Sequence, residues 1–323
     1  MNIHNTDINN FHLSDYKYLF FDIFYKDNKI YLILPIYDNH IDNQSINITI
    51  NENKLEITKK IEKNKYEPTL IYIYDYISDA DNIIVNVEYN NIIKTYNLTN
   101  NLIITKYDLS LTTLFKDDYK LFPIFYEYYK NQGVDHFFMY YNGKLTKEIS
   151  DIFNFNDVTL IEWDYQYWND SKYKYSHHAQ LGQMHHAIYR YGKNISDYMI
   201  FCDLDEYLYI NDTINIKNYI LNNSDIDKFG FCNKWSNTID NIYPKTFPHS
   251  FLTSDSMNYG NRSKNIYKIN SIDTIGIHNS SSYNINPKQE TNFILFHFYN
   301  WTNNDRIIKN VDKLITIIQS YPC

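Results

Sequence analysis

The chain has 323 residues, of which 44% are hydrophobic and 18% aromatic, enough for two domains with sizeable cores. Its formal net charge is −8 and it lacks a long basic block, which argues against nucleic acid as a partner. It has three cysteines and no apolar run long enough to cross a bilayer, which argues against a disulfide scaffold and a membrane protein.

The N-terminus shows no signal-peptide pattern, so we expect a soluble, cytoplasmic protein. Asn, Ile, Lys and Tyr are abundant, with 34 Tyr against only 7 Gly, as in proteins from an AT-rich genome. A large DNA virus is one such source, and the host cytoplasm would then be the compartment. The composition does not indicate an oligomeric state.

Up to about residue 105 the sequence consists of short alternating segments, and none has the period of a helix. The expected strands are Tyr18–Tyr25, Lys29–Ile36, Ser45–Ile50, Lys54–Ile57, Thr69–Tyr74, Asn82–Tyr89 and Ile92–Leu98. We predict a small all-β, sandwich-like domain over residues 1–105. It is either a packing module or a carbohydrate-binding domain that stacks sugars on Tyr72, Tyr74 and Tyr76.

From residue 106 onward, strands alternate with helices. The expected strands are Leu109–Phe115, Asp135–Asn142, Val158–Trp163 and Met199–Cys202; the expected helices are Lys120–Asn131, Ile149–Phe153 and His177–Tyr191. Gly133 and Gly192 stand where two of the helices should end. The alternation predicts an α/β domain with a Rossmann-like, mostly parallel sheet over residues 106–323.

The apolar strand Met199–Cys202 is followed at once by Asp203, Asp205 and Glu206. Unpaired carboxylates beside a core are costly, and a bound divalent cation would remove that cost. In an extended chain the two aspartates point to the same side, and hard oxygen ligands suit Mg²⁺ or Mn²⁺. Open α/β sheets also bind ligands at the carboxyl ends of their strands. The alternative is a solvated acidic turn.

Two further clusters allow more than one interpretation. The helical histidines are His177, His178, His185 and His186. They lack the spacing of a zinc site, so we expect residues of the helix surface or of an acceptor cleft. The aromatic run is Trp163, Tyr165, Tyr167 and Trp168. It is either core packing or a platform for an acceptor sugar.

Several segments occur in the order of a known family. They are Thr112-Thr-Leu-Phe-Lys, Tyr126-Glu-Tyr-Tyr, Gly133-Val-Asp-His-Phe, Gln180, Ala187-Ile-Tyr-Arg-Tyr, Phe201-Cys-Asp-Leu-Asp-Glu-Tyr-Leu, Lys264-Asn-Ile-Tyr-Lys, Gly276-Ile-His278 and Phe296-His-Phe. Over about residues 108–300 the chain resembles the GT-A glycosyltransferases of the family 92 and family 2-like group.

The resemblance implies a GT-A fold and inverting transfer of a sugar from a nucleotide-sugar donor, UDP-linked, to a glycan or protein-glycan acceptor. It also implies a divalent cation, Mn²⁺ or Mg²⁺. Two alternatives remain open. One is a non-catalytic glycan-binding or structural protein with the same fold. The other is a metal-dependent nucleotidyl or phosphoryl transferase, which the lack of a Gly-rich phosphate loop weakens.

The resemblance further implies roles for residues around the acidic motif. Asp203 would lie near the donor ribose and the metal, Asp205 would be the principal metal ligand, and Glu206 would support the strand end. His278 would complete the metal shell, with His297 as the competing candidate for that position.

The donor-binding residues implied by the resemblance are Thr112, Thr113, Phe115, Gln180 and Lys264, the last facing the diphosphate. After the second strand, Tyr141-Asn-Gly-Lys replaces the usual Asp-Asn followed by Ser and Asp, which leaves Asn142 as the candidate nucleotide contact. An inverting transferase needs a carboxylate as general base. Position after the metal strand favours Asp240 first and Asp255 second.

Overall fold

The computed structural model describes residues 8–14, 17–35, 46–62, 69–100, 105–167, 178–210, 214–238, 244–248, 250–254, 262–278, 285–299, 301 and 314–318. Within these ranges, no helix is both long enough and apolar enough to cross a membrane.

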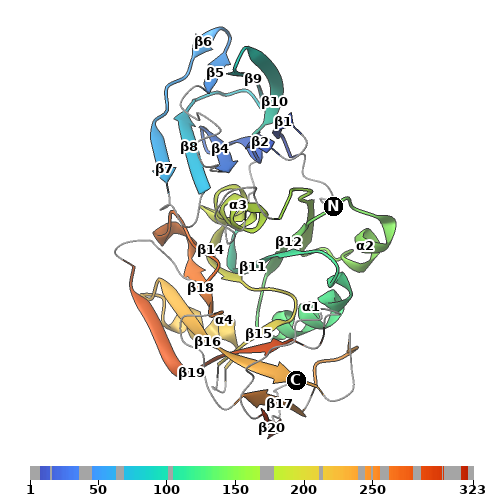
Figure 1. Cartoon of the computed structure of the whole chain (residues 1–323). Coiled ribbons are helices and arrows are strands. Elements are labelled where there is room, and N and C mark those ends of the chain that lie inside the picture. The colour runs from blue at the N-terminus through green and yellow to red at the C-terminus, as the bar shows by residue number, and fades with distance from the viewer. Residues whose placement is uncertain are drawn as a thin grey trace.

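Small antiparallel sheets form the N-terminal part of the chain, drawn in blue and teal in Figure 1. The first has the order β3-β4-β8-β7, with β3 (Asp22–Lys26), β4 (Lys29–Pro35), β8 (Thr69–Asp75) and β7 (Lys59–Glu62). The second has the order β10-β9-β5-β6, with β10 (Ile92–Thr99), β9 (Asn82–Tyr89), β5 (Asn47–Ile50) and β6 (Asn53–Lys54). A hairpin pairs β1 (Phe11–Ser14) with β2 (Lys17–Phe20). Both four-stranded sheets contribute to one core, which confirms the sandwich-like architecture.

The sheet β3-β4-β8-β7 is buried on both faces. On β4, Ile30 and Leu32 belong to the core of the N-terminal part, whereas Tyr31 and Ile33 pack in a second core that contains residues of α3 (His178–His186). Successive residues of a strand point to opposite faces, so an almost wholly apolar strand fits this position. Tyr72 and Tyr74 are each 1% exposed, since both side chains pack in the core of the N-terminal part. The prediction of a sugar-binding surface on these two tyrosines is therefore wrong.

The remaining chain forms a ten-stranded mixed sheet with the order β13-β12-β11-β14-β18-β16-β17-β20, in which β19 pairs with β16 and β15 with β19. The strands are β11 (Tyr107–Phe115), β12 (His136–Tyr141), β13 (Val158–Glu162), β14 (Ser196–Phe201), β15 (Glu206–Ile210), β16 (Lys228–Asn237), β17 (Ser250–Ser254), β18 (Lys264–Lys268), β19 (Pro287–Phe298) and β20 (Leu314–Ile318). Strands β11 to β14 pair in parallel, as the α/β pattern predicts, and β18 adds to β14 antiparallel.

Helices lie between successive strands of the large sheet, and the first three of them connect parallel strands. They are α1 (Phe122–Asn131), which follows the 3-10 turn η2 (Tyr119–Leu121), then α2 (Lys147–Ile152), α3, which continues as the π-helical turn η3 (Ala187–Gly192), and α4 (Ile216–Asn222). Gly133 follows α1 with a φ of 89°, a conformation that favours glycine, which is consistent with its predicted role as the helix stop. Figure 1 shows α3 between the small sheets and the large one.

We propose that the two parts of the chain meet at about residue 105, between β10 and β11. They share a core across that boundary, because Phe24 and Tyr31 from the small sheets pack with Trp163 and Met184 from the larger part. The N-terminal part is therefore not expected to move as an independent body.

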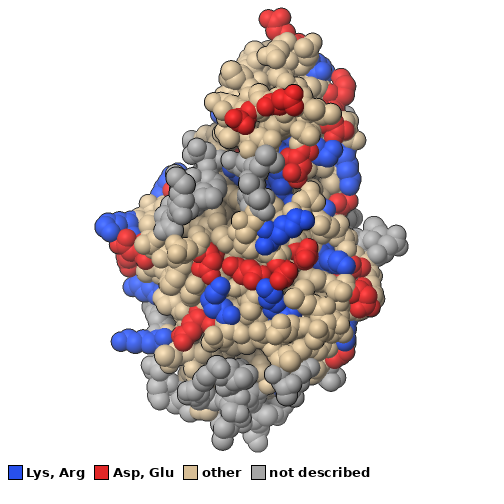
Figure 2. All heavy atoms as spheres, turned by 180° about the vertical axis from the view of Figure 1, so that it is seen from behind, with Lys and Arg blue, Asp and Glu red and all other residues tan. Residues whose placement is uncertain are grey.

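Both signs of charge lie side by side on the surface. Figure 2 shows acidic and basic side chains interspersed on the face behind the view of Figure 1. Described ion pairs include Lys130 with Asp157 at 2.6 Å and Lys217 with Asp135 at 2.8 Å. Solvent-exposed pairs contribute about 0–1 kcal/mol each, so the fold depends mainly on its shared cores.

Candidate active site

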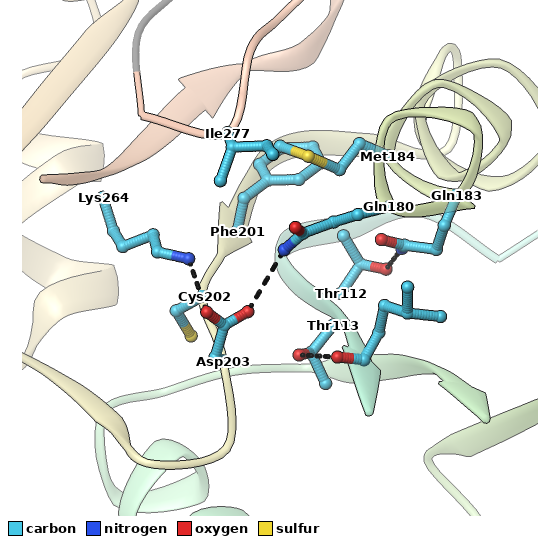
Figure 3. Close-up of a pocket in the computed structure, with 11 residues that line it drawn as sticks. Thr112, Thr113, Gln180, Gln183, Met184, Phe201, Cys202, Asp203, Lys264 and Ile277 are labelled. Carbon is cyan, nitrogen blue, oxygen red and sulfur yellow. Dashed lines mark hydrogen bonds and ion pairs between the residues drawn. The ribbon is translucent and has the colours of Figure 1, made fainter. Parts of the chain in front are cut away.

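A pocket opens where β14 ends, between β11 and α3 (Figure 3). Its polar lining consists of Thr112, Thr113, Gln180, Gln183, Asp203 and Lys264. β11 and β14 are adjacent and parallel, with Thr112 opposite Phe201, so their last residues reach the same edge of the sheet. Ligands of open α/β sheets bind at this edge.

Lys264 joins the two acids at the end of β14. Phe201 pairs with Asn265 across β14 and β18, which places Lys264 just beyond the strand end. Its Nζ lies 2.9 Å from Oδ2 of Asp203 and 3.0 Å from Oε2 of Glu206. The backbone N–H of Asp203 also donates to Oε2 of Glu206 at 2.8 Å. The acids that seemed unpaired in the sequence therefore share a buried ammonium group.

Burial and charge act against each other in this cluster. Burial disfavours the charged ammonium group, but the two neighbouring carboxylates outweigh it and raise the pKa of Lys264. Burial also disfavours the Asp203 carboxylate, but Lys264 outweighs it and lowers the pKa of Asp203. For Glu206, which is 1% exposed, burial outweighs Lys264 and raises the pKa to about 7.

Two glutamines of α3 reach toward the pocket. Gln180 accepts a hydrogen bond from the Tyr167 hydroxyl at 2.9 Å, and its Nε2 donates to Oδ1 of Asp203 at 3.4 Å. Gln183 donates to Oγ1 of Thr112 at 2.8 Å. The sequence analysis predicted Gln180 but missed Gln183. The spacing of the two glutamines could have identified Gln183, because residues three apart lie on one face of a helix.

His297 lies on the other side of the acidic segment. Glu206 pairs with His297 across β15 and β19. The ring Nε2 is 3.4 Å from Oδ2 of Asp205, and Nδ1 is 3.5 Å from Oε1 of Glu206. Burial disfavours the charged ring, but Asp205 and then Glu206 outweigh it and raise the pKa of His297. In this arrangement His297 is suited to an ion pair rather than to metal ligation.

His278 has the opposite character. Its Nδ1 lies 3.2 Å from the carbonyl oxygen of Ser263, and a carbonyl can only accept, so Nδ1 carries the hydrogen. Burial, with a contribution from Lys264, lowers the pKa of His278 to about 4. The ring is therefore neutral, and its Nε2 keeps a lone pair. Metal-binding histidines have this form, with the second ring nitrogen held by a carbonyl or carboxylate.

A metal at this site would depend on few protein ligands. Among the described residues, no three His, Cys, Asp or Glu side chains converge as an all-protein cage requires. Magnesium-type sites commonly use one or two carboxylates together with substrate phosphates and water. Asp203, Asp205 and His278 are the candidates for such a site, and their assignment as metal ligands stays a prediction.

Asp118, in the turn after β11, is a residue that the sequence analysis missed. Its Oδ1 accepts from the backbone N–H of Lys116 at 3.1 Å. Burial, followed by repulsion from Asp205, raises the pKa of Asp118 to about 7. The sequence pattern that could have identified it is the pair Asp117-Asp118, one residue after the end of β11, at the edge of the sheet where β14 also ends.

Phe115 and Asn142 are not brought to the pocket. The Phe115 ring stacks on Phe153 in the core, with centroids 4.6 Å apart. Nδ2 of Asn142 donates to the carbonyl oxygens of Trp163 at 2.9 Å and Tyr165 at 2.8 Å, so this side chain holds the loop after β13. Asp240 and Asp255, the predicted general bases, lie outside the described residues.

The structure also decides between interpretations of the two remaining clusters. His185 and His186 are 0% exposed, so their assignment to the helix surface or an acceptor cleft is wrong. The hydrophobic environment is tolerated because both rings are hydrogen bonded, His185 to the carbonyl of Leu181 and His186 to Tyr140.

For the aromatic run, Trp163 is 0% exposed and Tyr165 6%, which confirms core packing for these two. The side chains of His177, His178 and Trp168 lie outside the described residues.

Comparison with known proteins agrees with the fold. None of the curated proteins compared with the chain matches it. The model of Glycosyltransferase family 92 matches residues 106–317, more than half of the chain, from just before β11 to the last but one residue of β20. This span contains every residue of the pocket described above. The chain belongs to glycosyltransferase family 92 and is a glycosyltransferase.

Proposed function

We propose that the pocket at the end of β14 binds the nucleotide diphosphate of a UDP-sugar, and that the enzyme transfers the sugar to a glycan or protein-glycan acceptor with inversion. The observation that carries the proposal is the cluster at the edge of the parallel strands in which the buried Lys264 and Glu206 meet the partly exposed carboxylate of Asp203. Thr112, Thr113 and Gln180 add hydrogen-bonding groups to the same pocket.

Lys264 is our candidate for direct contact with the donor. Its ammonium group has three hydrogens, and two of its contacts are the carboxylates of Asp203 and Glu206. We assign the third hydrogen to a phosphate oxygen of the donor. A fixed ammonium group at this position would stabilise negative charge that develops on the leaving diphosphate.

The charge balance of the site supports a divalent cation. The ammonium group of Lys264 is already paired with Asp203 and Glu206, and Asp205 lies 3.4 Å from His297, so a diphosphate would bring further negative charge to a site that already holds three acids. Mn²⁺ or Mg²⁺ held by Asp203, Asp205 and His278 would offset that charge. The ion supplies electrostatic stabilisation of the diphosphate when it is bound. His297, after release from Asp205, remains the competing candidate for the position of His278.

Removal of the acceptor proton is assigned to the segment after β16. We keep Asp240 as the first candidate for the general base and Asp255 as the second. An inverting mechanism requires a carboxylate within hydrogen-bonding reach of the acceptor hydroxyl.

Calorimetry with UDP and Mn²⁺ tests the proposal. The wild-type protein should bind the pair, and Asp205→Ala should weaken binding about 100-fold or more, since ligand and supporting residues of metal sites have effects of this size. Asp151→Ala is the matched control, because this carboxylate is 62% exposed on α2 and pairs with Lys147. A wild-type protein that fails to bind, or equal binding by the Asp205 variant, would refute the proposal. A screen of UDP-sugars for Mn²⁺-dependent hydrolysis then identifies the donor sugar.

A further inference from the structure

The helix α3 connects the N-terminal sheets to the pocket. On one side, Gln180 and Gln183 form hydrogen bonds with Asp203 and Thr112. On the other side, α3 contacts β4 and β8 of the N-terminal part. The position of the pocket wall therefore depends on how closely this helix approaches the small sheets.

Gly182 sets that approach. A Cβ atom placed on it would lie 2.3 Å from Cε2 and 2.6 Å from Cδ2 of Phe21. The α-helix has 3.6 residues per turn, so residue 182 faces nearly away from Gln180. The Phe21 ring thus occupies the space of the missing side chain, on the side of α3 turned away from the pocket.

The Phe21 ring has little room to move. It is 1% exposed, and its centroid lies 5.4 Å from that of Trp163 and 4.8 Å from that of Tyr165. The Tyr165 hydroxyl also donates to the carbonyl oxygen of Phe21. Ring and backbone are both held, so a side chain at position 182 would displace the helix as well as the ring.

A second group of contacts fixes the other end of the helical segment. Asp22, next to Phe21, is 0% exposed and accepts from Nη1 of Arg190 at 2.5 Å and Nε2 of His186 at 2.8 Å. Lys26 donates to the carbonyl oxygen of Lys193 at 2.6 Å and to two carbonyls of the π-helical turn at 3.2 Å. Residues of β3 and the residue before it therefore hold α3 and its extension at several points.

We propose that Phe21 is a positioning residue of the donor pocket. Through its contact with Gly182, the N-terminal part sets the depth at which α3 presents Gln180 to Asp203 and Gln183 to Thr112. This inference rests on the proposed function of the pocket. The Gln180–Asp203 hydrogen bond is 3.4 Å long, close to the limit for such a bond, so it is sensitive to a shift of the helix.

Gly182→Ala and Phe21→Ala form a double-mutant test. In Gly182→Ala the gap must open from 2.3 Å to the 3.4 Å at which ordinary contact begins, a shift of about 1.1 Å. Misplacements of about 1 Å can cost up to about 100-fold, so we expect UDP–Mn²⁺ binding about tenfold weaker. Phe21→Ala removes the contact and should weaken binding by a similar factor. In the double variant the new methyl group occupies part of the space left by the ring, and binding should return to within about threefold of the wild type.

Ile23→Ala is the control. Ile23 is 0% exposed in the core of the N-terminal part, so this variant should lose stability without a change in UDP–Mn²⁺ affinity. Wild-type affinity in folded Gly182→Ala, or additive losses in the double variant, would overturn the proposal. If Gly182→Ala does not fold, wild-type affinity in Phe21→Ala overturns it instead.

Crystal structures without ligand give a readout that needs no donor. In Phe21→Ala or Gly182→Ala, the Gln180–Asp203 separation should change by about 1 Å, in keeping with the required shift of α3. An unmoved Gln180 would overturn the positioning role regardless of the nucleotide. A displaced Gln180 in a protein whose wild type binds no UDP with Mn²⁺ would support the positioning role and refute the proposed function.

Discussion

Asp22 offers a sharp test of how the two parts of the chain are joined. Its carboxylate is fully buried and accepts from Arg190, from His186 and from the backbone N–H of Asn9, the last at 2.8 Å. Asp22→Asn keeps the shape of the side chain but removes its charge and one acceptor atom. Arg190, only 8% exposed, is then left as a buried cation without its counter-charge.

The expected loss follows from the cost of an unpaired buried charge. Removing one partner of a buried pair typically destabilises a protein by about 3–5 kcal/mol, whereas replacing both partners with apolar groups is often nearly neutral. The total stability of a protein is about 5–15 kcal/mol, so Asp22→Asn should shift the unfolding transition clearly. Arg190→Met should cost a similar amount, because it removes the guanidinium group and leaves the buried carboxylate with only His186 and the backbone N–H of Asn9 as partners.

Urea unfolding followed by circular dichroism at pH 7 measures these losses. We expect the double variant Asp22→Asn/Arg190→Met to lose less than the sum of the single variants, by about 2 kcal/mol or more. If the losses of unfolding free energy are strictly additive, and the free energy depends on urea concentration with the same slope in all variants, the two residues do not stabilise each other and the reasoning is refuted.

Two other measurements test the site and its surroundings. Lys264→Met leaves Asp203 and Glu206 without their ammonium group, so we expect about 3–5 kcal/mol lower stability and loss of UDP–Mn²⁺ binding; unchanged urea unfolding would contradict this. Burial lowers the pKa of His136 from 6.5 to about 4, so the ring binds a proton more weakly in the folded state than in the unfolded state. The free energy of unfolding is therefore highest above pH 6.5 and decreases as the pH falls from 6.5 through 4. Between pH 7 and pH 4, the free energy of unfolding of His136→Gln should therefore fall by up to about 3 kcal/mol less than that of the wild type. Equal decreases in the two proteins would contradict this role of His136.

The local pattern of the sequence predicts most strands, because alternation and apolar runs depend only on which faces are buried. It fails at Tyr18–Tyr25, expected as one strand. The structure divides this segment into β2 and β3 at Phe21, whose ring packs against Gly182 far along the chain. A contact between residues so distant in sequence leaves no periodic signal near Phe21.

The sequence predicts which residues belong to the site better than it predicts the contacts between them. The order of motifs indicates that Asp203 and Lys264 belong together, but their ion pair with Glu206 depends on the register between β14 and β18. Phe115 lies at the end of its strand, as the sequence predicts, but its ring turns into the core against Phe153. Side-chain direction at the end of a strand follows from packing partners that a single sequence does not reveal.

The burial of β4 on both faces limits how this enzyme can evolve by exchange of segments. A recombinant chain with a foreign N-terminal part would need an aromatic ring in the place of Phe21 beside Gly182, and a carboxylate in the place of Asp22 beside Arg190. Gain or loss of the N-terminal part therefore requires matched substitutions on both sides of its contact with α3. We expect the two halves of this chain to have been inherited as one unit.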